Sequence, residues 1–315
     1  MHIPKNRLFK WIGGKNWLKK ELLEKTETIL RDKKEVEFYI EPFVGGLGSF
    51  LAIYPKLKDK KIKKIVLNDI NTLIIETYIQ VKNNPEKLLA EILKIEKEHY
   101  KTIPDSAYKL HMTEDKEKLK IQLSKTKDFY NKKRDEFNYK KFDRNISIET
   151  VAIFLYLMSN CFNGVYRENS KGFYNTPFNW SNTKQNIEGR TKKIKEYSSF
   201  FNETEFIFEN MDVFDLLDKY NEKNSFIYLD PPYLNEKSIE NKYSKEDFGE
   251  FEQAKLLDYI LKYDMVLFSN HYMDYFVQFF ERKNIKYSKI ARKNIMSASK
   301  ESRESDIYEI LAYKY

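Results

Sequence analysis

Short apolar runs alternate with longer amphipathic stretches along most of the chain. The runs of strand length lie at 38–40, 65–67, 206–208, 226–229 and 265–268. Between them, apolar residues recur at helical spacing over 73–81 and over 88–95, and Pro85 suits the start of the second helix. Strands that alternate with helices in this way predict an α/β fold in which crossover helices join a mostly parallel sheet.

The alternation stops in the middle of the chain and changes near its end. From about 91 to 145 the strand signal disappears and charged residues dominate, which predicts a helical insertion between two halves of the sheet. The mixed-sign run at 114–120 is typical of a solvated helix face. Two β segments, 287–295 and 307–313, bracket a polar loop and predict a closing β-hairpin.

Composition adds a candidate partner to this picture. The 41% apolar and 16% aromatic content predicts a folded protein, since these side chains offset the entropy of ordering. Lys and Arg total 56 against 48 Asp and Glu, and the resulting net charge of +8 favours a polyanionic partner such as nucleic acid.

Cysteine and histidine usage narrows the compartment and the chemistry. Cys161 is the single cysteine of the sequence, so it forms no internal disulfide, and the four histidines show no zinc-type spacing. The first residues lack the apolar core of a signal peptide, and the longest apolar run, 151–158, is too short to span a bilayer. We therefore expect a cytoplasmic protein with no membrane segment and no metal.

A glycine-rich segment, Glu41–Ser49, follows the first predicted strand and precedes a helix. Its glycines would let the backbone approach a bound nucleotide closely, although a tight turn explains them equally well. Asp69 ends the next strand, 21 residues after Gly48, where an acid accepts hydrogen bonds from a ribose diol. Together they predict an adenosine-containing cofactor, either a dinucleotide or S-adenosylmethionine, and the missing GKS/GKT ending disfavours ATP.

A second motif, Asp230-Pro231-Pro232-Tyr233, follows an apolar strand at the edge where open α/β sheets bind ligands. The prolines stiffen the turn, so an exocyclic amine could donate hydrogens to Asp230 and to the Pro231 carbonyl while Tyr233 stacks on its ring. Held in this way, the amine is ready for methyl transfer, because the positive charge that develops on it is stabilised. A plain surface turn is the alternative.

These blocks, in this order, resemble the Dam-type DNA adenine methyltransferases, the α group of the amino-methyltransferases. Phe9–Lys15 resembles the family's K-W-x-G-G-K element, Asn68–Asn71 its N-D-I-N element and Asp230–Tyr233 its catalytic motif. The resemblance implies S-adenosylmethionine as cofactor, S-adenosylhomocysteine as product, and Asp230, Pro231, Pro232 and Tyr233 as catalytic residues. The cofactor contacts that it implies are Trp11, Lys15, Phe43, Gly45, Gly46, Gly48, Asp69, Ile70, Asp212 and Asp230.

The segment 162–178 resembles the family's target-recognition stretch. Its Asn, Arg and aromatic residues suit phosphate contact, base-edge hydrogen bonds and stacking, and Arg167 is the candidate guanine reader. Alternatively, Asn163-Gly164 only makes a turn and Arg167 pairs with Glu168 or a phosphate. The DNA contacts that the resemblance implies are Lys10, Asn163, Val165, Arg167, Asn175, Pro177, Arg292, Lys293 and Arg303. Phe268–His271 resembles a strand end of the family, where we expect His271 to be a surface polar residue.

The resemblance implies a Rossmann-like S-adenosylmethionine-dependent methyltransferase domain at 1–90 and 190–315, with a C-terminal β-hairpin and a mainly helical DNA-recognition insertion at 91–189. We expect it to methylate N6 of a flipped adenine in a short site of double-stranded DNA, with GATC as the first trial. Methylation of RNA adenine or of cytosine N4, and a catalytically silent DNA-binding subunit, stay open as alternatives. We expect a monomer that is associated with the nucleoid and has a cognate restriction endonuclease as a partner.

Overall fold

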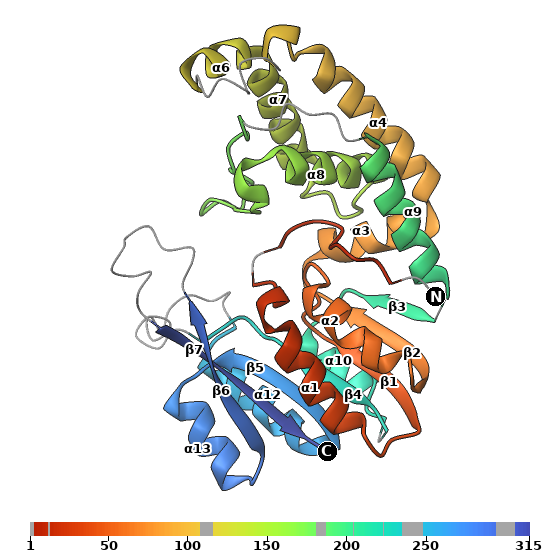
Figure 1. Ribbon diagram of the computed structural model, residues 1–315, viewed down its shortest axis with the longest axis vertical. Coiled ribbons are helices and arrows are strands. Elements are labelled where there is room, and N and C mark those ends of the chain that lie inside the picture. The colour runs from red at the N-terminus through yellow and green to blue at the C-terminus, as the bar shows by residue number, and fades with distance from the viewer. Residues whose placement is uncertain are drawn as a thin grey trace. The chain divides into compact units, whose positions relative to one another are not determined.

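The computed structural model (Figure 1) divides into two compact units. It describes residues 3–11, 13–107, 116–180, 187–203, 205–222, 224–234, 248–293 and 306–315. One unit, the helical unit, comprises 1–14, 45–51 and 71–204. The other, the sheet unit, comprises 15–44, 52–70 and 205–315.

A mixed sheet organises the sheet unit. Its strands are β1 (Glu35–Glu41), β2 (Lys61–Asn68), β3 (Phe206–Glu209), β4 (Phe226–Leu229), β5 (Met265–His271), β6 (Lys286–Lys293) and β7 (Asp306–Lys314). Their order is β3-β2-β1-β4-β5-β7-β6, in which β7 runs antiparallel to β5 and β6 and the other pairs are parallel. The order follows the doubly wound 3-2-1-4-5-6 pattern with an antiparallel strand inserted, so the predicted Rossmann-like α/β fold is confirmed.

All five predicted strands lie within observed strands, and the C-terminal hairpin is confirmed over its described residues. Burial explains where the strands enter the core. In β2 the first four residues are exposed or half-buried and the last four are buried, whereas all four residues of β4 are buried. The carboxyl ends of the central strands are therefore enclosed on both faces, as expected of a parallel sheet covered by helices.

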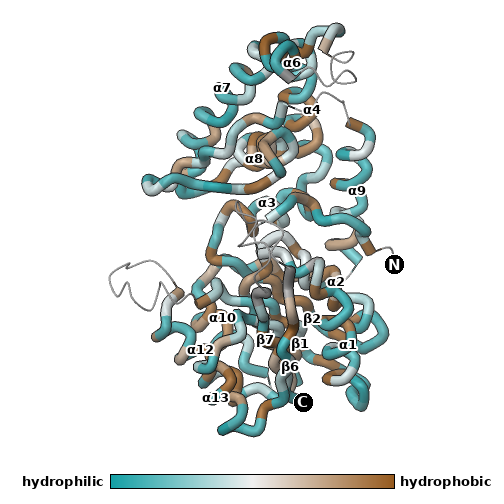
Figure 2. The backbone as a smooth tube through the Cα atoms, turned by 60° about the vertical axis from the view of Figure 1, so that its left-hand side comes forward, coloured by the Kyte–Doolittle hydropathy of each residue, from teal (hydrophilic) through white to brown (hydrophobic). Residues whose placement is uncertain are grey.

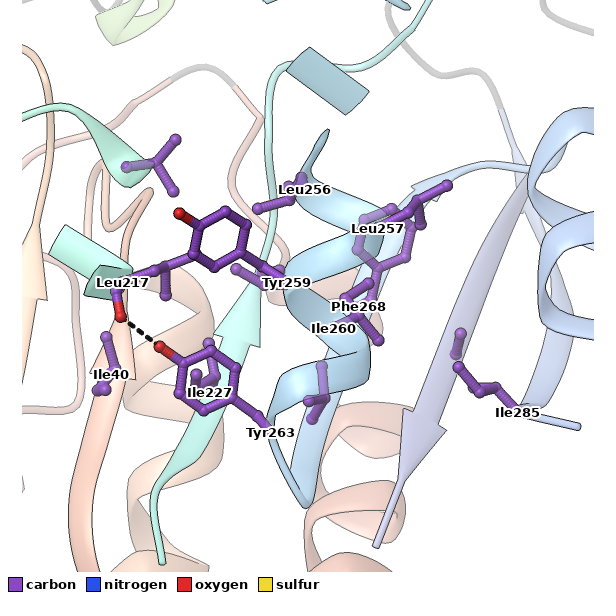
Figure 3. Close-up of a cluster of buried hydrophobic side chains, with 14 of the residues drawn as sticks. Ile40, Leu217, Ile227, Leu256, Leu257, Tyr259, Ile260, Tyr263, Phe268 and Ile285 are labelled. Atoms are coloured by element: carbon purple, nitrogen blue, oxygen red, sulfur yellow. Dashed lines mark hydrogen bonds between the residues drawn. The ribbon is translucent and has the colours of Figure 1, made fainter. Parts of the chain in front are cut away.

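Helices cover the sheet. They are η1 (Asn16–Leu18), α1 (Lys19–Leu30), α10 (Val213–Lys219), α12 (Glu250–Lys262) and α13 (Asp274–Arg282). Figure 3 shows the core on the α12 side, where Leu257 and Ile260 lie in one cluster with Phe268 of β5. The Tyr263 hydroxyl after α12 donates a hydrogen bond to the Leu217 carbonyl at 2.5 Å, which satisfies a buried hydroxyl and joins two helix ends.

The strand order changes direction between β1 and β4. These neighbours pair in parallel through Tyr39 with Phe226 and Ile40 with Ile227, and the chain continues from them toward opposite edges of the sheet. At such a switch point the loops after the two strands separate, leaving a crevice at the carboxyl ends in which α/β proteins bind ligands. The motifs predicted from the sequence follow these same strands.

The helical unit is built around α8. Its helices are α3 (Thr72–Asn83), α4 (Pro85–Lys101), α6 (Lys116–Gln122), α7 (Ser124–Lys140), α8 (Ile148–Asn160), η2 (Phe162–Gly164) and α9 (Ile187–Glu203). A further helix, α2 (Gly48–Leu57), begins in this unit and ends in the sheet unit. Figure 2 shows the contrast between the apolar α8 and the hydrophilic α7. Because α8 is apolar nearly all round, it is buried between α4 and α7.

The predicted insertion is mainly helical, since α4, α6, α7 and α8 cover most of its described residues, whereas 161–180 forms a loop with the short helix η2 and two isolated β-bridges. Within the mixed-charge run, 117–120 are exposed except for Leu119, as expected of a solvated face. The helical unit also takes in α3 and α9, so its compact boundaries lie further out than 91 and 189. The assignment of DNA recognition to 91–189 stays a prediction.

Across the described ranges, no helix combines the length and the apolar character needed to cross a membrane.

Candidate active site

Asp230 lies directly after β4 at the carboxyl edge of the sheet. Its Oδ1 is 2.8 Å from Nζ of Lys15 and accepts a 3.0 Å hydrogen bond from Oγ of Ser269. Lys15 is only 4% exposed, so this is a buried ion pair. Burial raises the pKa of the Asp230 carboxyl above its usual value, while Lys15 and the Ser269 hydroxyl act in the opposite direction.

Ser269 connects this carboxylate to the core of the sheet. It lies in β5, which pairs with β4, and its Oγ is also 3.0 Å from the hydroxyl of Tyr228. Burial raises the pKa of Tyr228 well above its usual value, so its hydroxyl remains a donor. The chain of hydroxyls from Tyr228 through Ser269 therefore ends on the Asp230 oxygen.

Tyr233 is held by contacts from three directions. Its hydroxyl donates a 2.7 Å hydrogen bond to Oε2 of Glu309, a fully buried residue of β7. The ring of His271 meets the Tyr233 ring at 4.5 Å between centroids and 71° between planes. Nζ of Lys15 lies 4.5 Å from the ring centroid. The orientation of the Tyr233 ring is thus defined by β5, β7 and the segment before α1.

The turn between Asp230 and Tyr233 is also fixed. Nε2 of the buried Gln253 in α12 donates to the Pro232 carbonyl at 2.8 Å. Gln253 is in turn held by Nδ2 of Asn270, which lies 3.3 Å from Oε1 of Gln253. Helix α12 and strand β5 therefore prevent the turn from moving independently of the sheet.

The loops after β1 and β3 are fastened together by Asn68 at the end of β2. Its Nδ2 donates to the carbonyls of Pro42 at 2.9 Å and Met211 at 3.1 Å, and its Oδ1 accepts from the Met211 amide at 3.0 Å. Asn68 is 1% exposed; its bond to Pro42 is buried, and its two bonds to Met211 are partly buried. This explains physically why an Asn precedes the acid in the N-D-I-N element.

Asp69 and Ile70 continue from this anchored point. Nδ2 of Asn210 donates to both of their carbonyls, at 2.8 and 3.0 Å. Asp69 is half-buried, whereas Ile70 is 71% exposed. A carboxylate beside an exposed aliphatic side chain suits a ligand that combines a diol with a flat ring.

In the helical unit, the glycine loop packs against Trp11. The Tyr78 hydroxyl donates to the Gly45 carbonyl, and a side chain at Gly46 would place its Cβ 2.9 Å from the Cβ of Trp11. Trp11 stacks in turn on Tyr166 with 4.9 Å between ring centroids. The absence of a side chain at these glycines therefore makes room for Trp11, and their predicted approach to a bound nucleotide stays a prediction.

The turn at 163–164 adopts the left-handed backbone that its sequence favours. Asn163 has φ 56° and Gly164 has φ 65°. Nζ of Lys10 donates to the Asn163 carbonyl at 3.2 Å, and a Cβ on Gly164 would come within 2.8 Å of the Lys10 side chain. The turn thus fixes Lys10 beside the segment that carries Arg167.

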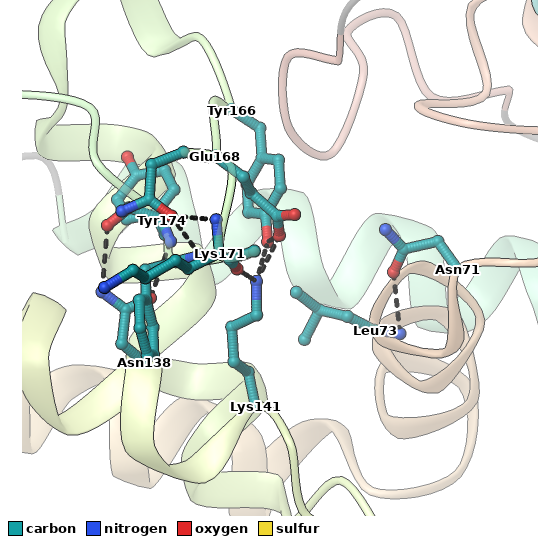
Figure 4. Close-up of polar contacts among 11 residues, drawn as sticks. Asn71, Leu73, Asn138, Lys141, Tyr166, Glu168, Lys171 and Tyr174 are labelled. Atoms are coloured by element: carbon teal, nitrogen blue, oxygen red, sulfur yellow. Dashed lines mark hydrogen bonds and ion pairs between the residues drawn. The ribbon is translucent and has the colours of Figure 1, made fainter. Parts of the chain in front are cut away.

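Arg167 is exposed and held by Asn175 across the loop. Its Nε donates to Oδ1 of Asn175 at 2.7 Å, and its backbone carbonyl accepts from the Asn175 amide at 2.9 Å. Figure 4 shows that Glu168 instead forms an ion pair with Lys141, at the C-terminal end of α7. The alternative pairing of Arg167 with Glu168 is therefore not the one that the structure contains.

Helix α7 supports this loop through Asn138. Its side chain donates to the Tyr174 carbonyl at 2.9 Å and accepts from the Tyr174 amide at 2.7 Å (Figure 4). A pocket of about 480 Å³ lies between α7 and the loop, with Arg134, Asn169 and Asn175 among its lining residues. The loop therefore presents polar side chains from a rigid helical support.

A family model described as D12 class N6 adenine-specific DNA methyltransferase matches residues 11–295. The chain belongs to this family of DNA adenine methyltransferases.

Individual relatives agree with the family. The chain is 31% identical to type II methyltransferase M.MjaIII of Methanocaldococcus jannaschii, over 97% of this chain and 98% of that protein. It is 28% identical to the DNA adenine methylase of Haemophilus influenzae, over 97% and 94% of the two chains. For the DNA adenine methylase of Escherichia coli the identity is 26%, over 92% and 90%. The expected enzyme class, an adenine-specific DNA methyltransferase, is confirmed.

The structure distributes the predicted residues of this methyltransferase between its two units. In the sheet unit, the carboxyl ends of the strands hold Phe43, Asp69, Ile70, Asp212, Asp230, Pro231, Pro232 and Tyr233, with Lys15 bonded to Asp230. The helical unit holds Lys10, Trp11, Gly45, Gly46, Gly48, Asn163, Val165, Arg167, Asn175 and Pro177. Asp212 caps α10, since its Oδ1 accepts from the Phe214 amide at 2.8 Å.

Three predicted DNA contacts of the methyltransferase have no described side-chain environment. Arg292 and Lys293 end strand β6, where only their backbone is described, and Arg303 lies outside the described residues. Two other predicted DNA contacts have described hydrogen bonds within the loop. The Val165 carbonyl accepts from the Thr176 hydroxyl, and the Pro177 carbonyl accepts from the Phe162 amide, each at 2.8 Å.

Sequence reasoning missed several groups of the methyltransferase site. Ser269 lies within the quoted strand-end motif, so its position beside Asp230 follows once β4 and β5 are paired. His271, expected as a surface residue, is partly buried against Tyr233. Glu309 and Gln253 had no signal, because they reach the site from a distant strand and helix.

Proposed function

We propose that this methyltransferase transfers the methyl group of S-adenosylmethionine to N6 of an adenine turned out of a short duplex site. The observation that carries the proposal is the enclosed carboxylate of Asp230 at the switch point of the sheet, followed within one turn by the immobilised ring of Tyr233. An amine acceptor beside a fixed aromatic ring is what a flipped base requires.

Asp230 and Pro231 hold the adenine amine. The described contacts of the Asp230 carboxylate fall on Oδ1, so we assign Oδ2 to one N6 hydrogen and the Pro231 carbonyl to the other. Bonds to both hydrogens draw the nitrogen lone pair out of conjugation with the ring. The negative carboxylate then stabilises the positive charge that develops on N6.

The surroundings of Asp230 suit it to receive the departing proton as well. Burial raises the pKa of this carboxyl, which makes it a stronger proton acceptor, while Lys15 and Ser269 favour the ionised form. The two effects oppose each other, so the group can start charged and still accept a proton after transfer. Tyr233 holds the base in the required plane by stacking on it.

The donor set of the sheet unit fits S-adenosylmethionine. We assign the ribose diol to Asp69 and one face of the adenine ring to the exposed Ile70. The side chain of Asn210 fixes the backbone of both residues. Further contacts in this unit are assigned to Lys15, Phe43, Asp212 and Asp230, and the family resemblance also implies Trp11, Gly45, Gly46 and Gly48 of the helical unit. When bound, the cofactor supplies an electrophilic methyl group on its sulfonium.

DNA recognition is assigned to the insertion 91–189 with Lys10, Arg292, Lys293 and Arg303. Asn175 accepts from Nε of Arg167 at 2.7 Å through its side chain and from Nη2 at 3.4 Å through its carbonyl. We assign the remaining N–H groups on Nη1 and Nη2 to O6 and N7 of a guanine. The net charge of +8 supports contact with the phosphate backbone. GATC is the first site to test, since several relatives are DNA adenine methylases.

We also propose that the enzyme acts as a monomer and has a cognate restriction endonuclease. The name of the Methanocaldococcus jannaschii relative, a type II methyltransferase, supports the second point. A culture that produces the enzyme should yield DNA resistant to an endonuclease of the same specificity, and the purified protein should sediment at the mass of one chain.

The test incubates the purified protein with methyl-labelled S-adenosylmethionine and duplex DNA, RNA or no nucleic acid, followed by nucleoside analysis. We expect label in N6-methyladenine from DNA alone. Asp230→Ala should abolish transfer, whereas Asp215→Ala, which removes an exposed carboxylate from α10 in the same unit, should not. Label in RNA or on cytosine N4, or an active Asp230→Ala variant, would show that the proposal is wrong.

A further inference from the structure

We propose that Glu309 is a positioning residue that sets the plane of the Tyr233 ring for stacking on the target base. The inference rests on the proposed function, in which Tyr233 stacks on the flipped adenine. Glu309 itself touches neither substrate in this proposal, and it acts only through the tyrosine hydroxyl.

The sheet topology brings Glu309 to the site. Strand β7 lies antiparallel between β5 and β6, where Glu309 pairs with His271 on one side and Ile290 on the other. From there its Oε2 accepts the Tyr233 hydroxyl hydrogen at 2.7 Å, across 76 residues of sequence. The pairing partner, His271, is the residue whose ring meets Tyr233 edge to face.

Stacking on a base uses the face of the tyrosine ring and does not need its hydroxyl. The hydroxyl bond therefore has another consequence: it fixes the far end of a side chain whose backbone end is fixed by the Gln253 bond to the Pro232 carbonyl. Burial raises the pKa of Tyr233 well above its usual value, and Asp230 and Glu309 act in the same direction, so the hydroxyl stays a donor.

Burial of Glu309 argues against a role in stability alone. The residue is fully buried, and removing a carboxylate from water costs free energy that its hydrogen bonds only partly offset. An apolar side chain at this strand position would avoid that cost. A carboxylate there is explained if its oxygen must hold the ring of Tyr233.

The experiment measures methylation kinetics, melting temperature, and the fluorescence of DNA with 2-aminopurine at the target adenine, in the full-length enzyme. We expect Glu309→Ala and Tyr233→Phe each to lower kcat about tenfold or more while KM for DNA changes less than about threefold. Combining them should cost no more than one alone, because both remove the same contact. Glu309→Gln keeps an acceptor and should restore kcat to within about threefold of the parent.

The fluorescence separates positioning from folding. A stacked 2-aminopurine is quenched, so the parent complex should be dimmer than the complexes of Glu309→Ala and Tyr233→Phe at equal DNA saturation. Tyr259→Phe is the matched control, because it removes another tyrosine–carboxylate bond of 2.7 Å, to Asp218, away from the site. It should leave kcat and fluorescence unchanged.

Three results would overturn the inference. The first is a kcat like that of the parent in Tyr233→Phe or in a folded Glu309→Ala variant, and the second is a double variant in which the two losses of kcat multiply. The third is a Glu309→Gln variant that melts like the parent but does not recover its kcat. If Glu309→Ala does not fold, Tyr233→Phe and Glu309→Gln still decide. Failure of the proposed function looks different, since the parent enzyme would then form no N6-methyladenine in DNA.

Discussion

The buried pair of Lys15 and Asp230 allows stability and chemistry to be separated by mutation. Its 2.8 Å separation gives an attraction of about 6 kcal/mol at an effective dielectric constant of about 20. Burial of each ion costs several kcal/mol, so the net contribution of the intact pair is small. Removal of one partner has a larger effect, because the remaining charge stays buried and loses this ion pair.

Asp230→Asn leaves the Lys15 ammonium, 4% exposed, beside a neutral amide. We expect the free energy of unfolding to fall by about 3–5 kcal/mol, as found when one member of a buried pair is removed. Lys15→Met should likewise destabilise the fold, since it leaves the carboxylate of Asp230 without the ammonium. The double variant contains neither charge and should recover to within about 2 kcal/mol of the parent.

Urea denaturation followed by intrinsic fluorescence measures the four free energies, and methyl transfer is assayed on the same samples. All three variants should have lost transfer, so the double variant would be stable and inactive. The reasoning fails if Asp230→Asn unfolds within 1 kcal/mol of the parent, a threshold well below the expected loss. It also fails if the double variant is no more stable than the weaker single variant.

Three further predictions follow from other contacts. Ser269→Ala removes a hydroxyl that lowers the pKa of Asp230, so the acid limb of the profile of kcat against pH should move to higher pH. An unmoved limb would contradict the role assigned to Ser269. Asn175→Ala releases Nε of Arg167 and should weaken the preference for DNA sites with the guanine by about fivefold or more. The preference is measured as the ratio of kcat/KM for the intact site to kcat/KM for a site with a substituted guanine, and an unchanged ratio in the variant would exclude base reading by Arg167. Burial lowers the pKa of His99 to about 4. As the pH falls from about 6.5 toward 4, the unfolded chain therefore takes up a proton before the folded protein does, and the free energy of unfolding should drop by about 3 kcal/mol. Urea melts should show this slope in the parent and lose it in His99→Gln, and a slope that persists would point to other groups.

The short motifs could be predicted from the sequence because their conformation depends on residues that are neighbours in the chain. Strands β1 to β5 are marked by short apolar runs, and the turn at Asp230–Tyr233 follows one of them directly. The rigidity of this turn comes from its two prolines, a property of the residues themselves. The same holds for Asn163-Gly164, whose sequence favours the left-handed turn that the backbone adopts.

Other parts of the site depended on pairing between distant segments. In the sequence, His271 looks like an ordinary polar residue and Glu309 like an ordinary strand residue. Their common role near Tyr233 becomes visible only when β5 and β7 pair and bring the two residues side by side. The glycines of the loop after β1 were predicted to approach a bound nucleotide, whereas only the folded helical unit shows that they also make room for Trp11. Insertion of β7 between β5 and β6 was equally invisible, since a hairpin pattern does not say which strand it pairs with.

The sequence by itself determined the α/β class, the order of the motifs, and the position of an acid at the end of a buried strand, because each depends on neighbouring residues. Tertiary structure decided which groups surround that acid: Lys15 from before α1, Ser269 from β5, and Glu309 from β7 behind Tyr233. Hydrogen bonds and ion pairs act over about 3 Å. Residues as far apart as Tyr233 and Glu309 reach that range only after the sheet has assembled, which is why the motif was predictable and its supports were not.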